Sequence, residues 1–179
     1  FKRVEGVLTD LEQNQQFEVE RIRKNTLSNP MASKHEAYYN SIAELTKKVN
    51  VYQNKFDKAN TRVKAYQKNL NYITNQRASL TKEVYELVAT MNSLEREIGG
   101  SPSKEEIGEK DNVSLFSNLY SSRGGWYPNS YGPTELHMKS FNVATELFQR
   151  LQPKIDTYLE KVNAVGKKME VAGAPILLD

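Results

Sequence analysis

The two histidines of the chain, His35 and His137, are its first candidates for acid–base chemistry or metal binding. Neither has the other histidine, or a carboxylate, at a spacing typical of metal ligands. The chain has no cysteine and no HExxH, GxSxG, P-loop or GxGxxG motif. We therefore expect both histidines at ordinary surface or helix-boundary positions, and we expect no catalytic residue, no metal and no cofactor.

Two carboxylate pairs, Asp10 with Glu12 and Glu109 with Asp111, are the next candidates. A carboxyl group needs an apolar setting to raise its pKa, and both pairs lie in polar segments that favour solvated surface. The glycines of segment 122–126 are not followed by the Gly-Lys-Ser/Thr of a phosphate-binding loop. We expect no enzyme in this chain, and any activity would lie in parts of a larger protein outside it.

A run of basic residues offers binding rather than catalysis. Nine Lys or Arg occur from Lys47 to Lys82 against one acid, Asp57, and three of the nine recur every seven residues: Lys48, Lys55 and Arg62. Such an edge could meet an acidic partner, a phosphate backbone or anionic lipid. The favoured interpretation is a solvated flank whose side-chain stems cover a helix seam. Nucleic acid is not expected, because the nearby aromatic residues belong to the apolar stripe and cannot stack on bases.

A loop rich in Gly, Pro and aromatic residues is the other candidate contact surface. It holds the only tryptophan, Trp126, beside Tyr127 and Tyr131, with Tyr120 just before it. Exposed rings would suit protein or carbohydrate contact. Because large rings are usually mostly buried, we favour a structural role in which they cover the end of a helical bundle.

The element that carries the basic run shows a heptad repeat, which keeps one apolar face of a helix turned toward a partner helix. The repeat fails once, at Arg77. Two interpretations stay open: one long helix to Ile98, or two antiparallel helices over 34–74 and 78–98 that turn near Asn75. The first stretch is Tyr38, Ile42, Leu45, Val49, Tyr52, Phe56, Ala59, Val63, Tyr66, Leu70 and Ile73, and the second is Leu80, Val84, Leu87, Met91, Leu94 and Ile98.

A third helix is predicted over 134–172. Segment 99–102 (GGSP) ends the preceding helix, and Val113 to Tyr120 is apolar enough for one or two helical turns. Pro153 lies inside the last helix, where its missing N–H predicts a kink. The third stripe is again heptad: Phe141, Ala144, Phe148, Leu151, Ile155, Tyr158, Val162, Val165 and Met169.

The 179 residues are therefore divided into three parts. Residues 1–22 contain a short strand-like piece at 6–9 and an alternation of polar and apolar residues at 16–22, and they are predicted to be the end of a β-domain, present here as a fragment. Residues 23–33 form a linker whose Ser33 can cap the next helix with Glu36. Residues 34–179 form a long-helix bundle with a loop at 99–133. The net charge of +3 does not by itself imply a nucleic-acid partner, and no apolar run is long enough for a membrane span.

Several segments occur in a suggestive order: 16–19 (QFEV), 25–30 (NTLSNP), 114–120 (SLFSNLY), 125–126 (GW), 132–134 (GPT) and 172–175 (AGAP). In this order they resemble the region after the β-propeller in bacterial exported proteins of the sortilin (VPS10-type), BNR-repeat class, often labelled glycosyl-hydrolase-like. The chain departs from that family in lacking propeller repeats and Asp-boxes and in being more basic and Tyr-rich. The resemblance implies export in a Gram-negative-type bacterium, to the periplasm or cell surface, and contact with a missing N-terminal propeller. It carries over no catalytic residue.

Together these features predict a mainly α fold, an antiparallel helical bundle or coiled-coil hairpin with a short N-terminal β remnant. The expected function is a non-catalytic structural or protein-interaction module of a larger exported, propeller-containing protein. Two alternatives stay open: an accessory region of a secreted hydrolase or peptidase, and a dimeric coiled-coil spacer. The candidate partner contacts are Lys48, Lys55, Arg62, Trp126, Tyr127 and Tyr131.

Overall fold

The computed structural model describes residues 32–73, 77–109, 111, 113–124 and 132–175, which belong to one compact unit, Ala32–Asp179. The predicted β remnant at 1–22, the linker up to Met31 and the loop aromatics Trp126, Tyr127 and Tyr131 lie outside the described residues. The elements in chain order are α1 (Ala32–Asn69), a 3-10 turn η1 (Leu70–Tyr72), α2 (Arg77–Gly99), α3 (Pro102–Glu106), α4 (Leu115–Ser122) and α5 (Glu135–Val171). The described part is helical and contains no strand, so the mainly α prediction is confirmed.

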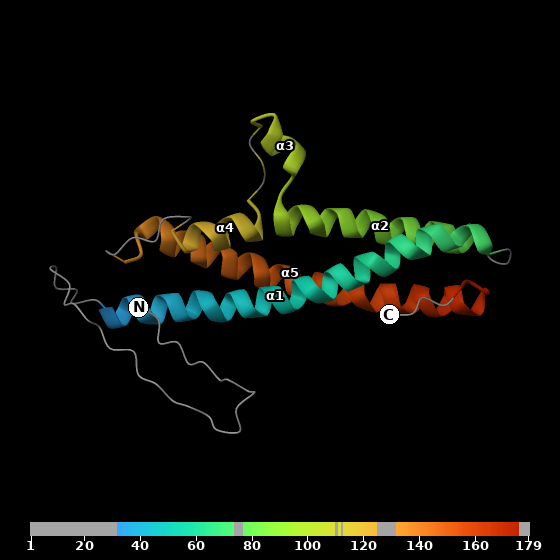
Figure 1. Ribbon diagram of the computed structural model, residues 1–179, viewed down its shortest axis with the longest axis horizontal. Coiled ribbons are helices and arrows are strands. Elements are labelled where there is room, and N and C mark those ends of the chain that lie inside the picture. The colour runs from blue at the N-terminus through green and yellow to red at the C-terminus, as the bar shows by residue number, and fades with distance from the viewer. Residues whose placement is uncertain (1–31, 74–76, 110, 112, 125–131, 176–179) are drawn as a thin grey trace, which may run out of the picture. The chain divides into compact units, whose positions relative to one another are not determined.

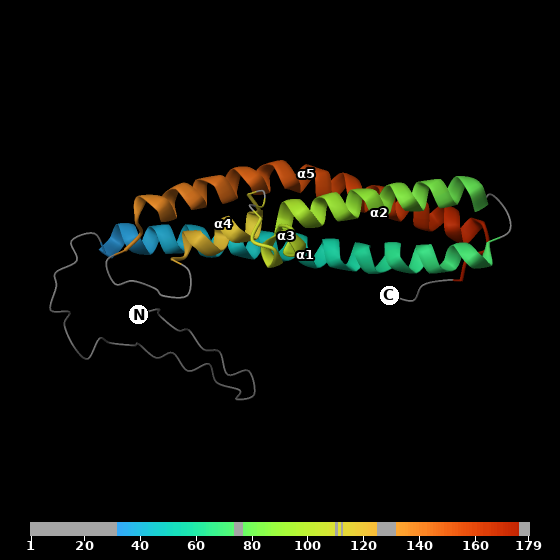
Figure 2. The same cartoon turned by 90° about the horizontal axis from the view of Figure 1, so that it is seen from above.

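The chain folds back on itself between α1 and α2, which decides between the two interpretations of the failed heptad. The last turn of α1 tightens into η1, and Ile73 then has extended backbone (φ −93°, ψ 128°). Arg77 is the first residue of α2, where an exposed polar side chain is acceptable. Figure 2 shows α2 returning alongside α1. One continuous helix from 34 to 98 is therefore wrong.

A three-helix bundle results because α4 continues the path of α2. In Figures 1 and 2, α2 and α4 follow one another in line, antiparallel to α1 and α5, while α3 projects away from the bundle. Cross-helix hydrogen bonds show that α1 and α5 run parallel, since Tyr52 meets Asp156 and Arg62 meets Asn163 further along both helices. The bundle thus consists of α1, α5 and the pair α2 and α4. This pair runs antiparallel to α1 and α5 and is interrupted between Gly99 and Leu115.

All three predicted stripes face the inside of this bundle. Each of their residues is buried except Tyr38, Tyr52 and Phe141, which are partly buried and packed against the core. Leu115 and Leu119 of α4 complete the core beside the first half of α5. Burying these apolar side chains provides most of the driving force for the fold.

The ends of the helices follow local sequence signals. The Thr134 hydroxyl accepts a hydrogen bond from the His137 backbone N–H (3.3 Å), and His137 Nδ1 accepts one from the Thr134 N–H (3.2 Å), so a histidine closes the capping box. At the other end, α5 stops at Val171, and Gly173 has a positive φ of 84°. Pro153 lies within α5, which continues through it as one helix, and the kink remains a prediction.

The described part of the region between α2 and α5 contains more helix than predicted. We expected a loop over 99–133 with one or two helical turns inside it, and α4 confirms those turns. The helix α3 was not expected, because its sequence PSKEE is polar and too short to show an amphipathic repeat. Within the described residues, no helix has the length and apolar character required to cross a membrane.

Candidate interaction surface

The strongest electrostatic feature of the bundle is a basic face on α1. Between Lys47 and Lys68 this helix carries seven basic residues and one acid, and the two remaining bases of the predicted run, Arg77 and Lys82, belong to α2. The single acid, Asp57, accepts a hydrogen bond from Gln53 (2.7 Å). Six lysines are exposed and define what we call the α1 basic face: Lys47, Lys48, Lys55, Lys58, Lys64 and Lys68.

The acidic side chains of the bundle leave these lysines uncompensated. Two ion pairs join α5 to α2, Lys154 to Glu97 (2.8 Å) and Lys168 to Glu83 (2.7 Å). Among the described residues, no ion pair involves a lysine of α1. Since unpaired charges of one sign add to a local potential, the α1 basic face is suited to an acidic surface.

The predicted contacts Lys48, Lys55 and Arg62 differ in how they are used. Lys48 is exposed, whereas the Lys55 ammonium lies 5.0 Å from the centre of the Tyr52 ring. The Arg62 guanidinium lies 6.0 Å from the Tyr66 ring centre and donates a hydrogen bond to Asn163 of α5 (2.7 Å). Lys55 and Arg62 thus cover the α1–α5 seam. Lys48 points to solvent and is the best placed of the three for a partner.

Three tyrosines of α1 are a feature that the heptad analysis did not single out. Tyr38, Tyr52 and Tyr66 recur every fourteen residues and each hydroxyl reaches another helix. Tyr38 donates to the Ser122 carbonyl (2.9 Å) and Tyr66 to the Val162 carbonyl (3.4 Å). Two groups of α5 bind the Tyr52 hydroxyl: it donates to Asp156 (3.2 Å) and accepts from Gln152 (2.9 Å). Their regular spacing was visible in the sequence and could have revealed them.

A polar contact also lies inside the core. The Tyr158 hydroxyl donates to Asn60 Oδ1 (2.9 Å), and Asn60 Nδ2 donates to Glu95 of α2 (3.2 Å). These two hydrogen bonds connect α5, α1 and α2. Asn60 is 5% exposed and Tyr158 is 1% exposed. Burial, with a smaller contribution from the charge of Glu95, raises the pKa of Tyr158. A buried and satisfied polar contact of this kind favours one helix register over others.

The pKa of Tyr38, whose hydroxyl bonds to the last residue of α4, is raised as well. Burial, followed by the neighbouring Tyr39, raises the pKa of Tyr38 to about 12. Its ring packs edge-on against Phe141 of α5, with ring centres 5.7 Å apart. Tyr38 therefore stays neutral in the folded chain well above the pH at which a free tyrosine ionises.

The histidines hold structural positions. His137 caps α5, and the His35 ring occupies the space that a side chain on Gly132 would need. Over the described ranges, no three His, Asp or Glu side chains come together in a way that could bind a metal ion. Asp10 and Glu12 lie outside those ranges, and Asp111 accepts a hydrogen bond from the Ser101 backbone N–H.

No protein-family model, no curated protein and no solved structure matches this chain.

Proposed function

We propose that this bundle is a non-catalytic protein-interaction module that binds an acidic protein surface through the α1 basic face. One observation carries the proposal: six exposed lysines on one helix with no ion-pair partner in the described bundle. Exposed charges of one sign speed association and select partners of opposite sign, which is how many transient protein interfaces work.

A protein partner is favoured over single-stranded nucleic acid because the aromatic rings of α1 between Lys47 and Lys68 are buried or partly buried. Phe56 is fully buried, and Tyr66 is 4% exposed. Neither ring is available to stack on a base, which is what sequence-tolerant binding of single strands uses. Vesicles of anionic lipid remain a competing ligand for a row of lysines, and the experiment below includes them.

The spacer alternative receives less support from the packing. A dimeric coiled coil needs an apolar heptad seam on its surface, and here all three stripes are covered by helices of the same chain. The accessory role in a secreted hydrolase depends on regions that this chain does not contain. We further propose that the module belongs to an exported, propeller-containing protein of the cell envelope, which rests on the segment order that resembles the sortilin-like class.

The test reverses charge on the α1 basic face without touching the seam. Lys48→Glu, Lys58→Glu and Lys64→Glu are combined in one variant, since these side chains are exposed and none makes an ion pair within the described bundle. The matched control combines Lys139→Glu, Lys161→Glu and Lys167→Glu, which are exposed on α5 and change the net charge equally. Helical circular dichroism should be the same for both variants and the unaltered chain.

Binding is then measured against purified partners captured from a bacterial envelope fraction and against anionic vesicles. We expect the α1 variant to weaken a protein complex about tenfold, mainly through slower association, and the control to change it by less than about twofold. Equal losses in the two variants would mean that net charge, and not the α1 basic face, decides binding. Binding to vesicles but to no protein would replace the protein partner with a membrane surface.

A further inference from the structure

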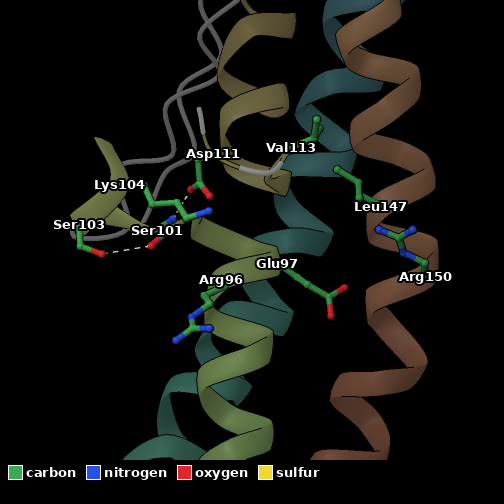
Figure 3. A pocket seen from close by; sticks show the side chains of 9 residues that line it. All are labelled: Arg96, Glu97, Ser101, Ser103, Lys104, Asp111, Val113, Leu147 and Arg150. Atoms are coloured by element: carbon green, nitrogen blue, oxygen red, sulfur yellow. Dashed lines mark hydrogen bonds between the residues drawn. The ribbon is translucent and has the colours of Figure 1, made fainter. Parts of the chain in front are cut away.

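The break between α2 and α4 leaves a cavity that is lined in part by α5. Between Gly99 and Leu115 the chain turns outward at Gly100, which has a positive φ of 88° and whose N–H donates to the Arg96 carbonyl (2.9 Å). A cavity of about 620 Å³ opens at this break (Figure 3). It is lined by Arg96, Glu97, Ser101, Ser103, Lys104, Asp111, Val113, Leu147 and Arg150.

The acidic residues of this cavity are already bound. Both carboxylate oxygens of Glu97 accept from the Lys154 ammonium at 2.8 Å. Asp111 accepts from the Ser101 backbone N–H at the foot of the projecting segment. The Glu97 charge is therefore compensated by a cation, whereas Asp111 is bonded to a neutral backbone donor and keeps its negative charge.

The basic residues of the cavity have no such partners. Arg96, Lys104 and Arg150 make no ion pair within the described residues. Figure 3 shows Lys104 of α3 beside Asp111 and Ser101, and Arg150 apart from them on α5. Arg96 lies in the last turn of α2, where a cation also complements the exposed helix carbonyls. Lys104 and Arg150 are therefore the two cations of the lining that could bind a ligand.

Apolar and hydroxyl groups complete the lining. Leu147 is 8% exposed and Val113 is 60% exposed, so one wall is apolar. The hydroxyls of Ser101 and Ser103 lie 3.3 Å apart and can donate further hydrogen bonds. A guanidinium and an ammonium that line the same cavity suit the oxygens of a phosphate, sulfate or carboxylate group.

We propose that this cavity binds a small organic oxyanion, with the charged group between Lys104 and Arg150 and an apolar body against Val113 and Leu147. The volume falls within the range of small-molecule sites. The site is separate from the α1 basic face and does not depend on the proposed protein partner.

The test follows backbone amide shifts of the full chain by ¹⁵N NMR during titration at constant ionic strength. The probes are phenyl phosphate, inorganic phosphate and benzyl alcohol. We expect saturable shifts around 96–104 and 147–150 with phenyl phosphate, weaker binding of inorganic phosphate because it lacks the apolar body, and no saturation with the uncharged alcohol.

Substitutions of the two cations test whether phenyl phosphate binds in this cavity. Lys104→Gln with Arg150→Gln should weaken phenyl phosphate at least about tenfold, and each single change about threefold, because charged hydrogen bonds are lost without altering the core. The control, Lys161→Gln with Lys167→Gln on α5, should change affinity by less than about twofold, since it removes two charges outside the cavity. Shifts that never saturate, equal losses in the two double variants, or equal affinity for the two phosphates would overturn the proposal.

Discussion

The two seams that α5 makes with its neighbours use different chemistry. Along the parallel α1–α5 seam, tyrosine hydroxyls at fourteen-residue intervals bond across the helices, and aromatic rings pack edge-on, as Tyr52 does with Phe148 at 5.5 Å. Along the antiparallel α2–α5 seam, aliphatic side chains fill the core and two half-exposed ion pairs lie outside it. Directional bonds in a buried or partly buried seam fix register, whereas exposed ion pairs contribute little to stability.

The largest expected effect lies where Tyr158 of α5 meets Asn60 of α1. Tyr158→Ala removes a fully buried ring and should cost about 3–5 kcal/mol in urea unfolding. Tyr158→Phe keeps the ring but leaves the buried Asn60 carbonyl without its donor, which should cost about 1–3 kcal/mol.

The control for the hydroxyl is Tyr85→Phe, since Tyr85 of α2 is 59% exposed and should lose almost nothing. If Tyr158→Phe proves as harmless as Tyr85→Phe, the buried hydroxyl does not hold the seam, and the contrast between the two seams disappears.

The next effect concerns a glycine that the α1–α5 seam requires. A side chain on Gly166 would overlap the Tyr66 hydroxyl, whereas one on Gly99 at the end of α2 would meet open space. Gly166→Ala should therefore destabilise the chain by about 1–3 kcal/mol despite the better helix propensity of alanine. Gly99→Ala should be neutral or slightly stabilising.

The Tyr66→Phe background sharpens this test, because it removes the atom that the new methyl group meets. Gly166→Ala should cost clearly less there than in the unaltered chain. An undiminished cost, measured by the same unfolding curves, would show that the seam is tight for another reason.

The pH dependence of stability above pH 10 reports on Tyr38 together with the buried Tyr158, and the Tyr38→Phe variant separates the two. The pKa of Tyr38 is about 12 in the folded chain against 10.0 for the free side chain, so the folded state holds this proton more tightly. Its contribution is complete below pH 10 and is lost as pH rises toward 12. Urea unfolding across this window should show falling stability, with a shallower fall in Tyr38→Phe. An identical pH dependence in both proteins would argue against this assignment.

The smallest effects are expected at the α2–α5 ion pairs. Lys154→Met and Lys168→Met should each cost less than about 1 kcal/mol, because the pairs are about a third to a half exposed, with the lysine side chains at 45% and 54%. The cost should shrink further in concentrated salt. If either lysine variant lost more unfolding free energy than Tyr158→Phe, and salt did not reduce that loss, the α2–α5 seam would contribute more than the α1–α5 seam.

The sequence predicted the helices and their buried faces because a heptad stripe depends on local periodicity. Every residue predicted for the three stripes is buried or packed against the core, from Ile42 to Met169. The hairpin was predicted only as one of two possibilities. No Gly or Pro marks the turn, and the gain from burying α2 against α1 and α5 is a tertiary effect that periodicity does not contain.

The parts that could not be predicted depend on contacts between distant residues. Asn60 occupies a polar flank of the stripe, and only the approach of Tyr158, 98 residues later, makes it a core residue. For Lys55 and Arg62 the sequence left two roles open, binding a partner or covering the helix seam. The Lys55 cation lies over the Tyr52 ring and the Arg62 cation over the Tyr66 ring, both on the same helix. The cavity beside Lys104 and Arg150 exists only because the segment with α3 separates α2 from α4.

The mass of the chain in solution shows whether one chain buries all three stripes by itself. Light scattering coupled to size-exclusion chromatography should give 20.5 kDa at every concentration from the micromolar to the millimolar range. A mass that rises toward twice this value with concentration would contradict the account, because the stripes would then be shared between two chains.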